Sequence, residues 1–192
     1  MAEDDRFLSE AQELTPKARD LVAAVGLGLP SATPAPEGRA RLLDALADAG
    51  RFDRFIAPVA RIADIDPERA KALLDALWTD PWGPAPLVPH IATRWVEGGP
   101  RAQNAIRGFL RVPAGEAFPE HEHLGDEEMV ILQGFAVVDD GRVYGPGETI
   151  VMKTGSSHGF TALPGAADLV YFAVVHEGVR AFGQEVRHTD GD

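Results

Sequence analysis

The sequence contains no cysteine, and none of its apolar runs approaches the ~20 residues that a membrane-spanning helix needs. The missing cysteines exclude disulfides, thiolate metal ligands and cysteine nucleophiles, so nitrogen and oxygen atoms must hold any metal ion. The first residues, Met-Ala-Glu-Asp-Asp-Arg, are acidic where a secretory signal would be basic and then apolar. We therefore expect a cytoplasmic protein without a membrane span.

Positive charge is also scarce. The formal net charge is -12 at pH 7, and residues 1–89 hold ten Lys and Arg against fifteen Asp and Glu, a net of -5. This balance opposes attraction to phosphate backbones and to anionic lipids. We expect neither direct nucleic-acid binding nor association with membranes.

Two stretches rich in Pro and Gly divide the chain, at 26–38 and 79–89. Proline fixes φ and removes a backbone donor, so both stretches indicate connections rather than regular elements. They predict a helical N-terminal region at 1–89, a β-barrel at 90–180 and a polar C-terminal tail at 181–192.

The first region has the apolar spacing of helices. A weak pattern covers 9–25, and one-face stripes follow at 42–49, ending before Gly50, and at 52–62. The next helix has a clear start, because Asp66 is a good N-cap and Pro67 suits the first helical position. Its apolar face runs from Ala70 to Leu77, before Asp80 and Pro81. Such stripes favour a shared core, and a groove for a protein partner is the alternative.

From His90 onward the pattern is that of an all-β sandwich or barrel. Short runs rich in Val, Ile, Phe and Thr alternate with Gly, Pro and Asp turns about every 8–12 residues. The predicted strands are 91–97, 105–112, 128–133, 135–138, 149–152, 158–162 and 169–176.

The residues with metal-binding chemistry lie in this half. His121 and His123 are two apart, so in a strand both imidazoles project from one face. Glu127 follows the turn at 124–126, and His158 follows a second turn-like segment, 154–157. Three imidazoles and a carboxylate form a plausible ligand set for zinc, manganese, iron or nickel, and the set does not choose among them. A bare His-x-His is weak evidence alone, because the chain has six histidines.

The spacing of the whole set resembles the two motifs of the cupin superfamily. Gly115, His121, His123, Glu127 and Gly134 follow the first motif, and Gly147, Gly155 and His158 follow the second. The likeness covers about 91–177. It implies a double-stranded β-helix, or jelly-roll, barrel that binds one divalent metal ion through His121, His123, Glu127 and His158.

Two positions depart from the second motif. Lys153 stands where a proline is usual, and Ala162 stands where an asparagine is usual. Neither supplies a ligand, so the departures concern the turn before His158 and its hydrogen bonds.

Several alternatives remain at the level of single residues. Glu128 competes with Glu127, but neighbouring strand residues face opposite ways, and only one of them can ligate. If Glu127 points inward, Met129 and Ile131 should follow it. His176 is either a residue of the barrel rim or an acid or base near the mouth, and His188 lies in the polar tail. A further set of apolar residues is either plain barrel core or the lining of a cavity: Phe109, Phe118, Met129, Ile131, Phe160 and Tyr171.

For the function, the helices followed by a cupin resemble ChrR-type anti-sigma proteins, in which N-terminal helices grip a sigma factor and the cupin responds to a chemical signal. That family has a His/Cys zinc site in its N-terminal domain, whereas residues 1–89 here contain neither residue type. We predict a ChrR-like sensor or regulatory protein that responds to a small molecule. A protein partner would bind through the N-terminal helices. The alternative is a metal-dependent dioxygenase or a related cupin enzyme for decarboxylation or isomerisation. The resemblance also implies a homodimer.

Overall fold

The computed structural model describes residues 50–165 and 167–188, which lie in one compact unit, Ala47–Asp192. The helix that we predict at 9–25 and the stripe at 42–49 fall outside the described residues. Within them, no helix is both long and apolar enough to cross a bilayer.

The helical elements come first in the described chain. They are η1 (Asp53–Phe55), α4 (Ile56–Ala63), α5 (Pro67–Asp75) and η2 (Ala76–Trp78). The predicted cap of α5 is confirmed, because Asp66 accepts a hydrogen bond from the backbone N–H of Arg69 at 2.7 Å, and Pro67 occupies the first turn. The apolar face continues through η2, where Leu77 is fully buried.

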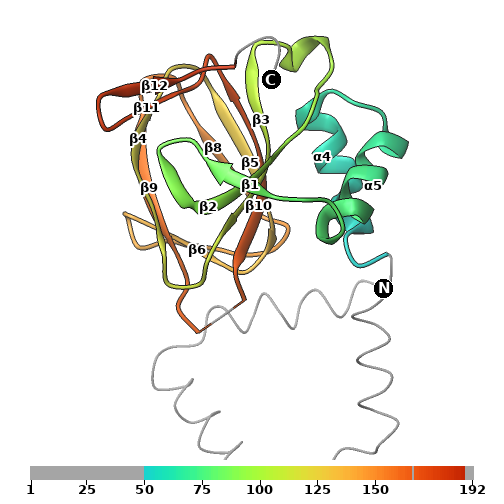
Figure 1. Cartoon of the computed structure of the whole chain (residues 1–192), viewed down its shortest axis with the longest axis horizontal. Helices are drawn as coiled ribbons and strands as arrows, with labels where there is room; N and C mark the ends of the chain where they lie inside the picture. The colour runs from blue at the N-terminus through green and yellow to red at the C-terminus, as the bar shows by residue number, and fades with distance from the viewer. Residues whose placement is uncertain (1–49, 166, 189–192) are drawn as a thin grey trace, which may run out of the picture. The chain divides into compact units, whose positions relative to one another are not determined.

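The described residues after the helices form two antiparallel sheets, which confirms the predicted mainly β fold (Figure 1). The first sheet has the order β1-β2-β3-β10-β5-β8, and the second β12-β11-β4-β9-β6-β7. In chain order, the strands and the one short helix η3 are β1 (Gly83–Ala85), β2 (Val88–Trp95), η3 (Pro100–Ala102), β3 (Ala105–Val112), β4 (Ala117–His123), β5 (Glu127–Gln133), β6 (Ala136–Val138), β7 (Val143–Tyr144), β8 (Thr149–Met152), β9 (Ser157–Ala162), β10 (Leu169–His176), β11 (Val179–Ala181) and β12 (Gln184–Val186).

The first sheet is covered on both faces, and β10 shows why. Its first seven residues are all buried, and alternate side chains belong to different cores. Val170, Phe172 and Val174 pack with the helices. Tyr171 and Ala173 pack between the two sheets. A continuous apolar run is expected for a strand that is buried on both sides.

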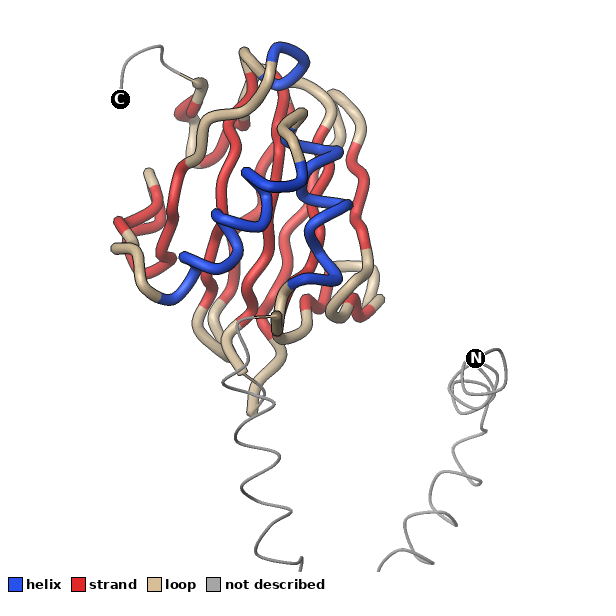
Figure 2. Tube along the Cα trace, turned by 90° about the vertical axis from the view of Figure 1, so that its right-hand side faces the viewer, coloured by secondary structure: helices blue, strands red, loops and turns tan. Residues whose placement is uncertain are grey.

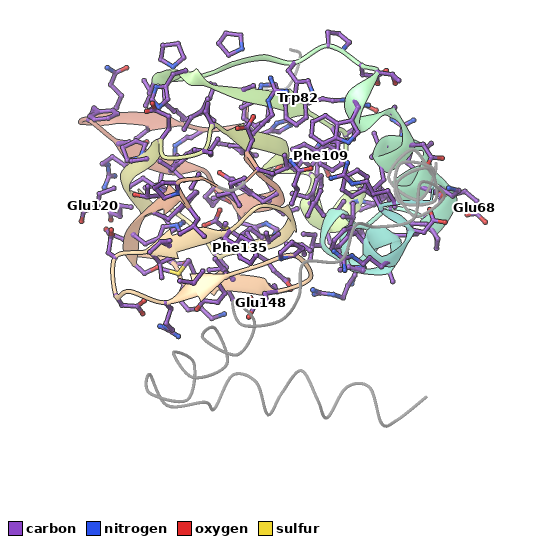
Figure 3. The ribbon with its side chains drawn as sticks, turned by 90° about the horizontal axis from the view of Figure 1, so that it is seen from below. Glu68, Trp82, Phe109, Glu120, Phe135 and Glu148 are labelled. Carbon is purple, nitrogen blue, oxygen red and sulfur yellow. The ribbon has the colours of Figure 1, made fainter. Side chains whose placement is uncertain are left out.

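The helices cover the outer face of the first sheet, and Figure 2 shows them lying across its strands. Phe109 of β3 and Phe172 of β10 meet edge to face beneath them, with ring centroids 4.9 Å apart. Phe109 lies between the strands and the helices in Figure 3, whereas Glu68 lies on the outer side of α5. The apolar stripe of α5 is therefore used inside the molecule, as the shared-core alternative predicts.

The predicted strands agree with the structure in the long, apolar runs and less well at the edges. The bounds of β3, β8 and β10 are as predicted, while β2 begins and ends earlier than the predicted 91–97. Strand β1 lies before residue 90 and β12 lies after residue 180. The two sheets therefore extend beyond the predicted barrel, 90–180, at both ends. Strand β1 has the sequence Gly-Pro-Ala, which is typical of a loop, and β12 is Gln-Glu-Val, which has only one apolar residue.

Candidate metal centre

Three strands bring the predicted ligands together. His121 and His123 lie near the end of β4, and Glu127 is the first residue of β5. His158 lies in β9, where it is paired directly opposite His121. Because β4 and β9 belong to the second sheet and β5 belongs to the first, the four side chains join the two sheets at one end of the interior.

The four side chains form one compact group. Their ligand atoms all lie within 4.8 Å of one another, close to the ~4.4 Å that separates opposite ligands of an ion bound at about 2.2 Å. His121, His123, Glu127 and His158 are 5%, 1%, 5% and 8% exposed. Four polar side chains are seldom buried together without partners, so their burial together is compatible with a shared metal ion.

Backbone carbonyls fix the orientation of two imidazoles. The Nδ1 of His121 lies 3.0 Å from the carbonyl oxygen of Pro119, and the Nδ1 of His123 lies 2.9 Å from that of Ser156. A carbonyl can only accept, so each Nδ1 carries a proton and donates it. This leaves the Nε2 atoms to face the group, an orientation that is common among metal-ligating histidines.

The Nε2 atom of His158 has no hydrogen-bond partner among the described residues, although it is buried. The nearby Oε2 of Glu127 lies 3.5 Å away, too far for a good hydrogen bond. The same oxygen lies 2.7 Å from Nε2 of His123. A buried imidazole nitrogen without a hydrogen bond, beside a carboxylate, is suited to share a cation with it, so the donor set fits a metal ion.

The electrostatics of the group follow from burial and from the single carboxylate. Burial lowers the pKa of His121 to about 4, against the smaller opposing charge of Glu127. Burial also lowers the pKa of His123, but the hydrogen bond and charge of Glu127 outweigh it and raise the pKa above 6.5. For Glu127, burial raises the pKa, yet the surrounding imidazoles outweigh burial and bring it to about 2. Glu127 is therefore ionised at neutral pH.

The turn before His158 is firmly held without the usual proline. Lys153 instead pairs with Asp126 at 2.7 Å, and the same carboxylate accepts the backbone N–H of Thr154 at 3.0 Å. Gly155 has a φ of 77°, a conformation that favours glycine, and its N–H donates to the carbonyl of His123. The ion pair thus ties the turn to the segment that carries Glu127. At the other departure, Ala162 is fully buried in the core.

The choice between the two neighbouring glutamates follows the predicted alternation. Glu127 points into the interior, and Met129 and Ile131 follow it into the core between the sheets. Glu128 points the other way and forms an ion pair with Arg61 of α4, with one contact of 3.0 Å. Glu128 is therefore not part of the group.

The other histidines that the sequence singled out lie apart from it. His176 ends β10 and is partly exposed, and its backbone N–H donates to the carbonyl of Asp126 at 3.0 Å. Neither it nor His188 belongs to the four-residue group. The rim alternative for His176 agrees with this position.

A cavity of about 80 Å³ reaches the group from the side of His121 and Glu127. Of the six apolar residues for which lining and core were the alternatives, Phe118, Phe160 and Tyr171 line it. Met129 and Ile131 belong to the core between the sheets, and Phe109 packs against the helices. Burial and the charge of Glu127 hold the pKa of the Tyr171 phenol well above its usual value. The sequence reasoning missed the lining residues Leu87 and Phe182. The sequence features that could have indicated them are the turn-forming pairs Pro86-Leu87 and Phe182-Gly183.

Part of the chain matches a known protein family. Residues 94–177 match the family described as ChrR Cupin-like domain. No curated protein sequence matches the chain. Among solved structures, the chain is similar to the crystal structure of Rhodobacter sphaeroides SigE in complex with the anti-sigma ChrR. The identity is 22% over 81% of this chain and 75% of that chain, with a TM-score of 0.48.

Two further solved structures are similar to the chain. An RmlC-like cupin protein from Ralstonia eutropha is 21% identical over 57% of this chain and 68% of that chain, with a TM-score of 0.45. An acetylacetone dioxygenase from Acinetobacter johnsonii is 15% identical over 55% of this chain and 78% of that chain, with a TM-score of 0.46.

Proposed function

Starting from the ChrR-like cupin domain that residues 94–177 form, we propose that this chain is a mononuclear metal-binding sensor or regulatory protein. His121, His123, Glu127 and His158 would hold one divalent ion. The observation that supports this most strongly is the buried group itself, with ligand atoms within 4.8 Å and an unpaired Nε2 on His158.

The ligand set favours an ion that accepts both imidazole and carboxylate, and zinc, iron, manganese and nickel all do. Bound there, such an ion would act as a Lewis acid on an oxygen of a small molecule. The chain's own part is to orient the imidazoles through Pro119 and Ser156 and to keep Glu127 ionised.

The proposed regulatory role is supported by the family match. Such a role requires a surface to which a protein partner binds. Ala70 and Leu74 of α5 and Leu77 of η2 are at most 2% exposed, so this stripe cannot accept a partner without unfolding. A partner would therefore bind to a surface other than this stripe. A homodimer and a cytoplasmic location stay predictions.

A metal-dependent dioxygenase or related enzyme is the second candidate, and it would use the same cavity. The cavity ends at His121 and Glu127, so a small molecule could reach the proposed ion. A sensor that detects a small molecule needs the same access, however. The cavity alone does not separate the two functions.

The first test is calorimetric titration of the chelator-treated full chain with Zn²⁺, Mn²⁺, Ni²⁺ and, without oxygen, Fe²⁺. We expect one site in the wild type and a large loss of affinity in His158→Ala, with His90→Ala, an exposed histidine of β2, as the control. Equal binding by all three proteins would contradict the site.

The second test separates sensor from enzyme. A host strain lacking the gene is complemented with the wild type or with His158→Ala. A sensor predicts that transcript levels of a defined gene set follow the intact site. An enzyme predicts unchanged transcripts and oxygen uptake by the iron-loaded protein with a small ketone or carboxylate, and that result would overturn the regulatory proposal.

A further inference from the structure

Two hairpin tips from different sheets meet at the cavity. The first joins β1 to β2 through Pro86 and Leu87, and the second joins β11 to β12 through Phe182 and Gly183. Both hairpins are visible on the barrel in Figure 1, and Leu87 and Phe182 both line the cavity.

Both tips have a backbone conformation that does not suit their side chains. Leu87 has a φ of 65° in the third position of a turn that begins at Ala85, where Gly or Asn is usual after Pro. Phe182 and Gly183 have φ of 51° and 73°, the pattern of a turn that favours Asn-Gly. Large apolar residues are uncommon in either place. Backbone strain of this kind gathers at ligand-binding sites.

One of the tips, and one strand residue beside the cavity, expose large apolar side chains. Phe182 is 66% exposed, and Trp95, which lines the same cavity, is 47% exposed. Together with the half-buried Leu87, they form an apolar rim around the mouth. Neither strand pairing nor the core explains this rim, since it faces outward.

The interior of the cavity has one polar end. The polar residues in its lining are Trp95, Arg107, His121, Glu127 and Tyr171. Arg107 lies on the same face of β3 as Ala105 and Phe109, which pack with the helices, so its side chain is directed away from the space between the sheets. Its Nη1 donates to the backbone carbonyls of Ala102 and Ala105. Apolar walls, including the stacked rings of Phe118 and Phe160, connect this end to the rim. The volume of about 80 Å³ is several times the ~15 Å³ that one water molecule needs.

We infer that Leu87 and Phe182 are specificity residues that hold the apolar end of a small ligand, whose single oxygen donor points to His121 and Glu127. The ligand class is a short apolar molecule with one terminal oxygen group. This inference rests on the proposed metal site, because the ion would be the partner of that oxygen.

Hexanoate and adipate are suitable probes, since they share a chain length and differ only at the far end. Ligand-observed NMR and calorimetry with the zinc-loaded full chain compare the two. We expect hexanoate to bind and adipate to bind far more weakly, because its second carboxylate would be buried among apolar side chains without a partner.

Leu87→Asn and Phe182→Asn test the tips themselves. Asn suits both turns, so each variant should unfold at or above the wild-type temperature, while its affinity for hexanoate falls by about tenfold or more, as for a lost apolar contact. Glu177→Asn is the matched control. Glu177 also has a positive φ, of 57°, but does not line the cavity, so this variant should keep the affinity.

The possible outcomes separate this inference from the metal site. Zinc binding without hexanoate binding, equal affinity for both probes, or unchanged affinity in both tip variants would each overturn the inference and leave the metal site intact. A dimer that forms through Phe182 and is lost in Phe182→Asn, without hexanoate binding, would assign the rim to a second copy and also overturn it. Failure to bind zinc would instead overturn the proposed function.

Discussion

At the scale of single residues, two neighbouring glutamates of β5 have different roles. Glu127 and Glu128 have the same chemistry, but β5 turns one inward to His123 and the other outward to Arg61. The alternation of side chains along a strand predicts this difference once the register is known. The sequence supplied the register through the spacing to Gly134.

Glu127→Gln should lower the affinity for zinc by more than the ~10–100-fold that is typical when only an outer partner of a ligand is removed. Calorimetric titration checks this. Glu128→Gln is the control and should leave the affinity unchanged. It removes only the ion pair with Arg61, and the loss of a partly exposed ion pair lowers the stability by at most ~1 kcal/mol. A similar loss in both variants would contradict the assignment.

Asp64 is a residue whose role the sequence does not reveal. It ends α4 with a φ of 56°, and its carboxylate accepts hydrogen bonds from the backbone N–H and Nε of Arg101, at 2.9 and 2.7 Å. The partner is 37 residues away, so no local pattern predicts it. The hydrogen bonds of Arg101 lower the pKa of Asp64 below its ordinary value of 3.8.

A lowered carboxyl pKa means that the ionised form contributes stability above the unfolded pKa, and that this contribution is lost as pH falls through the folded pKa. Asp64→Asn should therefore melt below the wild type at pH 7, and the difference in Tm should shrink as the pH is taken below 3.8. Thermal unfolding across this range measures it. A difference that stays constant with pH would show that the charge of Asp64 is not involved.

At the scale of elements, the tight turn from β4 to β5 positions Glu127. Gly125 lies at this turn, where a Cβ would collide with the backbone carbonyl of His176. Gly125→Ala should therefore destabilise the protein by about 1–3 kcal/mol, as overpacking does, and should weaken metal binding because Glu127 shifts.

Denaturant unfolding and metal titration of Gly125→Ala measure both effects. Gly83→Ala is the control, since a Cβ there meets nothing within 4 Å. If Gly125→Ala behaved like Gly83→Ala, the turn would not determine the position of Glu127.

The helices belong to a different core from the metal group, which makes their effects separable. Leu74 of α5 is 2% exposed and packs in the core on the outer face of the first sheet. Leu74→Ala should cost about 2–5 kcal/mol of unfolding free energy but leave the metal affinity of the folded protein unchanged.

Arg69→Ala, on the exposed side of the same helix, is the control and should stay within about 0.5 kcal/mol of the wild type. Denaturant unfolding gives the stabilities, and titration well below the Tm gives the affinities. A Leu74→Ala variant as stable as Arg69→Ala would mean that the stripe is not part of the core.

The accuracy of the sequence prediction also depends on the element. The start of α5 was predictable because Asp66 and Pro67 act locally, and β3 and β10 were predictable because their apolar runs are long. Strands β1, β7, β11 and β12 have two or three residues each and were not predicted, although β6, with three, was. The seven-residue β4, rich in Glu and His, was also not among the predicted strands. Such strands depend on the neighbour they pair with rather than on their own composition.

At the scale of the whole molecule, the two-sheet fold and the grouping of the four side chains followed from motif spacing. The cavity and its rim did not, since they arise where the β1–β2 and β11–β12 hairpins approach each other in space. These hairpins are about 95 residues apart in the sequence. Likewise, the sequence shows an apolar stripe in α5 but not the surface that covers it.

The most direct test of the central claim is the metal content of the tag-free full chain, measured by elemental mass spectrometry. We expect a near-stoichiometric divalent metal in the wild type and in His90→Ala, and its loss in the His121→Ala/His123→Ala double variant, with circular dichroism showing that the double variant is folded. Wild-type protein with no more metal than a folded double variant, even after each candidate ion has been supplied, would contradict the metal centre.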